Sequence, residues 1–191
     1  QYCANYDDSC EKLLLLASGS TRGYPYFATG ENGLPDLTKR LSTIEEVRAD
    51  GKTQMVQGAY NRHDADFLKA VWNQVIYTNK QPNEDHYNEY VEDMCKQRNL
   101  AESYQALNTY NISHLHNGVV EGTGEVDNIN VPVLVMWGNN DLVVVEQMTN
   151  EILEDLGDRA TYKELTGCGH SPLIDDLDLL KNTVEDFLER G

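Results

Sequence analysis

The chain has 191 residues, of which 32 are acidic and 15 are Lys or Arg, so its formal net charge is −17. That length corresponds to one globular domain, and the acidic excess disfavours nucleic acid and anionic membranes as partners, because phosphate binding needs clustered basic side chains. No apolar run approaches the roughly 20 residues that cross a bilayer, and the N-terminal residues lack the basic and apolar regions of a signal peptide, so we expect a cytoplasmic protein that binds no membrane and keeps its four cysteines reduced.

The first predicted strand contains four consecutive leucines at 13–16, followed by Ala17 and a break at Gly19. A continuous apolar run between polar breaks is typical of a strand that helices cover on both faces, as in a parallel sheet. We assign this strand to residues 13–18 and a short helix to the residues before it.

The stretch 31–120 is predicted to be mostly helical. Residues 42–45 read Ser-Thr-Ile-Glu, which is the Ser-x-x-Glu spacing of a capping box. Apolar residues recur every three or four positions over 67–76 and more weakly over 87–94. Short amphipathic helices joined by polar linkers are typical of a lid rather than of a core.

The pattern of apolar residues changes at residue 131. A β-branched run over 131–137 predicts a buried strand, and the apolar positions over 148–156 predict a helix that ends at Gly157 in a left-handed conformation.

A shorter strand at 161–165 and a final helix over 173–187 follow. Alternating strands and helices with short loops favour a parallel sheet with right-handed crossovers. We expect the acidic runs 151–158 and 175–178 to lie on the outer faces of their helices.

Each of the last two strands is followed by a loop with a side chain suited to chemistry. The first loop, 138–141, ends in Asp141, and the second, 167–172, contains His170. Functional groups gather beyond the carboxyl ends of the strands in open parallel sheets. We therefore expect the carboxylate to reach the imidazole, where it fixes the tautomer and stabilises the charged ring.

The segment from Val131 onward resembles the C-terminal part of the α/β-hydrolase fold family, with an apolar strand, Gly-x-x-Asp, a helix, a short strand and Gly-x-Gly-His-Ser-Pro. Residues 6–20 resemble the helix end and strand that follow the nucleophile elbow of that family. The resemblance implies an α/β fold with a partial parallel sheet of about three strands, flanking helices and a helical lid. Core residues 1–30, the lid 31–120 and the C-terminal core 121–191 would be its parts.

By this resemblance Asp141 is the triad acid and His170 is the general base. The Gly-x-Ser-x-Gly motif that carries the nucleophile in this family is absent, and the nearest pattern, residues 19–23, places its hydroxyl one position out of frame. Ser18 or Ser20 is a weak substitute, because no helix N-terminus follows to activate it. We expect the nucleophile to lie upstream of Gln1 and the chain alone to be inactive.

The resemblance implies the C-terminal part of an esterase-like serine hydrolase that acts on an ester, thioester or amide. The alternative is a non-catalytic protein that retains the fold and binds a small molecule or a partner. Arg22, Tyr24 and Tyr26 are candidate substrate contacts, although they fit lid anchors equally well. No cofactor is implied, and no metal is expected, because His114 and His116 lack nearby Cys or carboxylate partners.

The expected sheet, built from 13–18, 131–137 and 161–165, leaves an apolar edge without a neighbour. Such an edge pairs readily with another chain. Besides a small-molecule substrate, the expected partner is therefore either a missing N-terminal segment or a second copy of this chain.

Overall fold

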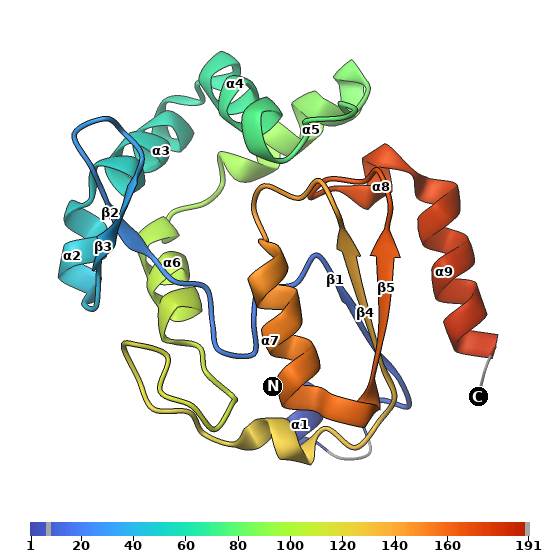
Figure 1. Ribbon diagram of the computed structural model, residues 1–191. Helices are drawn as coiled ribbons and strands as arrows, with labels where there is room; N and C mark the ends of the chain where they lie inside the picture. Colours follow the sequence, from blue (N-terminus) through green and yellow to red (C-terminus); the bar gives the residue numbers. More distant parts are fainter. Residues whose placement is uncertain (7–8, 190–191) are drawn as a thin grey trace.

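The computed structural model of the protein describes residues 1–6 and 9–189 and contains a parallel three-stranded sheet of order β1-β4-β5 (Figure 1). The strands are β1 (Leu13–Leu16), β4 (Val133–Gly138) and β5 (Ala160–Leu165). Leu13 is paired with Val133, and Val133 with Ala160, so all three strands run side by side from the same end. The predicted α/β fold class with a partial parallel sheet is confirmed.

The sheet lies between two helices, α7 (Glu146–Leu156) and α9 (Leu177–Glu189), and every residue of the central strand β4 is buried. Alternate side chains of β4 face opposite layers. The layer on the α7 side contains Val133, Val135, Ile152 and Leu156. The layer on the α9 side contains Leu134, Met136, Leu165 and Leu180. Burial on both faces is the reason why β4 is apolar at every position.

Several element boundaries, and the backbone conformation at Gly157, differ from the sequence prediction. The predicted final helix 173–187 is divided into α8 (Pro172–Asp175) and α9, which begins at Leu177. The first strand ends at Leu16 rather than at residue 18, because Ala17 turns the chain with a positive φ of 44°. The central strand spans Val133–Gly138 instead of 131–137. Gly157 ends α7 with a positive φ of 56°, but its ψ of −135° lies outside the left-handed helical region that we expected.

Between β1 and β4 the chain forms a helical segment, which we call the α2–α6 segment. It contains α2 (Ile44–Ala49), α3 (Gly51–Arg62), α4 (Ala65–Val75), α5 (Glu84–Met94) and α6 (Leu100–Thr109). Helices α3 to α6 share an apolar core around Leu68, Tyr87 and Val91, whereas α2 contributes Val47 to a separate cluster with Tyr26. Helices α4 and α5 lie on the side of the molecule toward which β4 and β5 point (Figure 1).

The predicted capping box at residues 42–45 is wrong by one position. Thr43 is the N-cap of α2: its hydroxyl accepts a hydrogen bond from the Glu46 amide at 3.3 Å, and the Glu46 carboxylate accepts one from the Thr43 amide at 3.0 Å. Both Ser42 and Thr43 have a Glu three positions ahead, so the sequence alone fits two registers. Glu46 also accepts from the Ser42 amide at 2.9 Å, which favours the observed register.

The prediction of a mostly helical 31–120 missed an antiparallel hairpin formed by β2 (Phe27–Thr29) and β3 (Pro35–Arg40). Gly33 in its turn has a positive φ of 78°, and Asn-Gly is a strong hairpin signal. Strand β3 is largely exposed, so it lacks the apolar alternation that would have revealed a strand.

The remaining elements are short. They are α1 (Tyr2–Asn5), α8 (Pro172–Asp175) and the 3-10 helices η1 (Glu125–Asn128) and η2 (Gly157–Arg159). The four cysteines, all in the described ranges, carry no disulfide, and the thiols of Cys3 and Cys10 lie against each other. Among the helices so described, none has the length and apolar character needed to span a bilayer.

The burial of Leu165, which has no exposed surface, gives a first testable expectation. Leu165→Ala should lower the free energy of unfolding by about 2–5 kcal/mol, because the side chain leaves a cavity between the sheet and α9. Leu107→Ala, at a position on α6 that is 51% exposed, is the matched control and should change it by less than about 0.5 kcal/mol. Chemical denaturation measures both, and equal losses would contradict the proposed core.

Candidate active site

The loop after β4 holds Asp141 in one orientation. Its carboxylate is completely buried, and Oδ1 accepts hydrogen bonds from the backbone amides of Val143 at 2.7 Å and Val144 at 2.9 Å. A buried carboxylate is stable only when hydrogen bonds replace its lost hydration. These two amides supply that replacement and leave Oδ2 for another donor.

That donor is His170, whose Nδ1 lies 2.9 Å from Asp141 Oδ2. Because a carboxylate only accepts hydrogen bonds, Nδ1 carries the proton and the lone pair of the neutral ring is on Nε2. Nε2 has no hydrogen-bond partner within the described residues, and the imidazole is 25% exposed. The structure therefore brings together the two residues that the sequence predicted, as a buried carboxylate behind a partly exposed imidazole.

The two loops approach each other closely at Gly138. The Asn140 amide donates to the Cys168 carbonyl at 3.0 Å, and the Gly167 amide donates to the Asn139 side chain at 2.8 Å. A Cβ added at Gly138 would lie 2.4 Å from the Cys168 carbonyl oxygen, which leaves no room for a side chain. The last residue of β4 is thus glycine because the histidine loop crosses directly over it.

Asp175 braces the histidine loop, and the expectation that the whole acidic run 175–178 lies on an outer face is wrong at this residue. Asp175 is 5% exposed, and its Oδ2 accepts from the Gly169 amide at 2.7 Å. Its Oδ1 accepts from the Lys80 amide at 3.3 Å. Asn79 also donates to the Gly167 carbonyl at 2.6 Å, so the α4–α5 connection supports this loop.

The sequence contained a signal for the burial of Asp175, but it is a helix-start signal and not an apolar periodicity. Pro172 fixes the start of a helix directly after the histidine loop, and Asp175 is the acid in its first turn. An acceptor at that point can satisfy loop amides, and burial then follows from the hydrogen bond.

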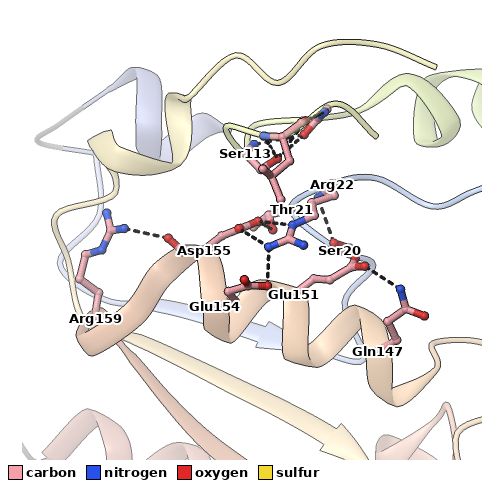
Figure 2. A network of polar contacts seen from close by, with 11 residues as sticks. Ser20, Thr21, Arg22, Ser113, Gln147, Glu151, Glu154, Asp155 and Arg159 are labelled. Atoms are coloured by element: carbon pink, nitrogen blue, oxygen red, sulfur yellow. Dashed lines mark hydrogen bonds and ion pairs between the residues drawn. The ribbon is translucent and has the colours of Figure 1, made fainter. Parts of the chain in front are cut away.

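Arg22 binds helix α7 (Figure 2). Its guanidinium contacts Asp155 and Glu154 at 2.7 Å each, and the hydrogen bond to Asp155 is the main reason why the pKa of Arg22 is raised. Thr21 donates to the same Asp155 at 2.5 Å. Asp155 has a side chain only 10% exposed, so the prediction of an outer-face run at 151–158 is wrong at this position.

Tyr24 and Tyr26 lie in different environments. The Tyr24 hydroxyl donates to the Val143 carbonyl, next to Asp141, at 2.7 Å. The buried Tyr26 hydroxyl lies 2.9 Å from Thr53 Oγ1, its ring stacks on Tyr104, and burial raises its pKa to about 12. Of the three candidate substrate contacts, Tyr24 thus lies at the loop after β4, residues 139–145, which we call the acid loop. Arg22 and Tyr26 bind other elements. Substrate contact by any of them stays a prediction.

A cavity of about 370 Å³ lies elsewhere, between α3 and α6. Its lining includes Arg48, Gln54, Gln57, Arg98 and Glu102, and no residue of the Asp141 and His170 loops. The expectation that His114 and His116 lack a nearby Cys or carboxylate, and for that reason hold no metal, is wrong in its reason for His114, which contacts Asp127 at 2.9 Å. In the described ranges no three His, Cys, Asp or Glu side chains are placed to hold an ion.

No protein-family model matches the sequence, and no curated protein matches it significantly. Solved structures do match. They include a hydrolase from Oleispira antarctica (10% identity, TM-score 0.60, 99% of this chain and 60% of that one) and an esterase from Exiguobacterium antarcticum (14%, 0.60, 98% and 61%). An esterase from Rhodococcus sp. ECU1013 is also similar (18%, 0.56, 99% and 60%).

These similarities show the fold. The chain has a partial α/β-hydrolase fold, as its sequence motifs predicted, and it spans about 60% of the length of the solved structures that it matches.

The crossing at Gly138 can be tested directly. Gly138→Ala should push the histidine loop away, weaken the hydrogen bond between His170 and Asp141 and lower the free energy of unfolding by about 1–3 kcal/mol. Gly19→Ala is the matched control, because the nearest atom to its added Cβ is 3.8 Å away. Denaturation measures the change in the free energy of unfolding, and the NMR resonance of the His170 Nδ1 proton reports the hydrogen bond to Asp141. If both variants behaved identically, the close contact at Gly138 would not constrain the histidine loop.

Proposed function

We propose that this chain is the part of an esterase-like serine hydrolase that supplies the acid and the base of a Ser-His-Asp triad. The observation that carries the proposal is the 2.9 Å contact between His170 and a fully buried Asp141, on loops that follow adjacent parallel strands. The fold is one that solved esterases and hydrolases share. The proposed substrate is a small ester, thioester or amide.

In this proposal His170 takes the proton of a serine hydroxyl through Nε2 as the serine oxygen attacks the carbonyl carbon. Asp141 keeps the proton on Nδ1 and stabilises the positive ring that forms. His170 then gives the proton to the leaving group, and the same steps with water release the acid product. Proton transfer of this kind contributes roughly 10²–10⁴-fold to the rate.

The serine, in the proposal, comes from a strand and turn that pair with the free edge of β1. Two observations support this. The sequence contains no Gly-x-Ser-x-Gly motif, and β1 has only β4 as a neighbour in the described part of the chain. The amides of Leu13 and Ala17 donate toward β4, so the amides of Leu14 and Leu16 face the opposite side by strand alternation. The backbone carbonyls of a further strand can accept hydrogen bonds from those two amides.

A serine-directed fluorophosphonate tests the proposal on the natural gene product that contains this sequence. We expect labelling of a serine, with a rate that falls about 10²-fold or more in His170→Ala, because the general base is lost. Asp141→Asn should also slow labelling, because an amide can donate to Nδ1 and favour the wrong tautomer. His86→Ala, at an exposed position of α5, is the control and should label like the wild type.

Unchanged labelling in His170→Ala would contradict the triad. A natural protein that is well folded but not labelled at all would favour the non-catalytic binding protein instead.

The open edge of β1 predicts the behaviour of the 191-residue chain by itself. Unpaired strand edges recruit other strands, so we expect the chain to self-associate as its concentration rises. Size-exclusion chromatography with light scattering measures this directly. A monomer that persists across the whole concentration range would contradict the pairing proposed for β1.

A further inference from the structure

The two residues whose amides donate to Asp141 also accept hydrogen bonds through their carbonyls. Val143 donates its N–H to Asp141, and its carbonyl accepts the Tyr24 hydroxyl at 2.7 Å. Val144 donates its N–H to the same oxygen, and its carbonyl accepts the Trp137 indole N–H at 2.7 Å. Each residue is thus fixed between the carboxylate and an aromatic donor.

The aromatic donors come from two different parts of the fold. Trp137 belongs to β4 and is 8% exposed, in a cluster with Val144 and Met148. Tyr24 packs against the same cluster from the loop after β1. Rigid rings with one polar end can hold a loop at little cost in side-chain entropy, which suits them to this task.

The backbone of Tyr24 is anchored as firmly as its hydroxyl. Its amide donates to the Leu107 carbonyl of α6 at 2.9 Å. The preceding Gly23 has a positive φ of 91°, and a Cβ there would lie 2.4 Å from the Tyr110 carbonyl oxygen. Tyr24 therefore connects α6, through its backbone amide, to the acid loop, through its hydroxyl. A shift of Tyr24 would break one of these hydrogen bonds or move one of the two elements.

We propose that Tyr24 is a positioning residue for the triad acid: its hydroxyl, together with the Trp137 indole, fixes Val143 and Val144 and so directs Asp141 Oδ2 at His170. This inference rests on the proposed function of the Asp141–His170 pair. It gives Tyr24 a role other than substrate contact, which was one of two roles left open by the sequence, because its hydroxyl donates a hydrogen bond to the Val143 carbonyl.

The Tyr24 hydroxyl keeps its proton over a wide pH range. Burial, and then the nearby charge of Asp141, raise the pKa of Tyr24 above its ordinary value. A raised pKa in the folded state means that the contribution of the hydroxyl is complete below the ordinary tyrosine pKa and is lost only as pH rises through the folded value. At neutral pH it is a donor.

The test compares two tyrosine-to-phenylalanine variants of the chain. Tyr24→Phe removes the hydroxyl beside the acid loop. Tyr87→Phe removes a hydroxyl in the α2–α6 segment that donates to Asn73 at 2.9 Å and to the Lys69 carbonyl at 3.3 Å. Each variant loses the single donor proton of a buried or partly buried tyrosine hydroxyl, so both should be destabilised similarly. The readout is exchange with water of the His170 Nδ1 proton, followed by NMR. We expect it to speed up about five- to tenfold in Tyr24→Phe, as for the loss of one hydrogen bond, and to be unchanged in Tyr87→Phe.

In the natural gene product, Tyr24→Phe should lower kcat for a small ester and leave KM unchanged, because the acid is displaced and no substrate contact is lost. A rise in KM with unchanged kcat would instead assign Tyr24 to substrate binding and overturn the inference. Trp137→Phe removes the other aromatic donor to the acid loop, the indole N–H on the Val144 carbonyl, and should show the same faster exchange if Tyr24→Phe does not fold.

Asp141→Asn separates failure of this inference from failure of the proposed function. If the Nδ1 signal is lost in Asp141→Asn but is unaffected in Tyr24→Phe, the pair stands and the positioning role is wrong. If Asp141→Asn leaves the signal unchanged, His170 does not depend on Asp141, and both proposals fail.

Discussion

The crossing of two loops over the end of β4 is the constraint on which the site depends. Parallel pairing of β4 with β5 brings their carboxyl ends to the same edge, so the chain segments that leave them meet. At Gly138 the carbonyl oxygen of Cys168 leaves no space for a Cβ atom. The resulting contact sets the separation of Asp141 and His170, and a side chain at this glycine would alter the geometry of both loops at once.

Both loops are also held by elements far from them in the sequence. The histidine loop is bound by Asn79 from the α4–α5 connection. Asp175, which holds the Gly169 amide, is itself bound to that connection through the Lys80 amide. The acid loop is bound by Tyr24, which in turn is anchored to the end of α6. The α2–α6 segment therefore contacts each half of the pair through hydrogen bonds to the loop backbone. In the proposed hydrolase, the packing of the α2–α6 segment would therefore influence the geometry of the Asp141–His170 pair as well as access to it.

Several parts of this arrangement follow from local patterns. The buried strand β4 was predicted from a continuous β-branched run and the helices α4 and α7 from apolar periodicity. Asp141 and His170 were predicted from their place after the last two strands. Errors arose where the pattern was ambiguous or absent. The capping box fits two registers, and the exposed strand β3 has no apolar alternation. Asp155 and Asp175 were assigned to the surface because acidic runs are usually solvated, and periodicity does not reveal a distant partner.

The sequence by itself determined the parallel sheet, the order of the acid and the histidine, and the absence of a Gly-x-Ser-x-Gly motif, because each of these is written in consecutive residues. Only the tertiary structure decided which polar side chains serve the site. Arg22 turned out to bind Asp155, Asp175 to accept from the Lys80 amide, and Tyr24 to hold the Val143 carbonyl. Hydrogen bonds between residues remote in sequence leave no local pattern, since any donor and acceptor of suitable geometry can form them once the chain has folded.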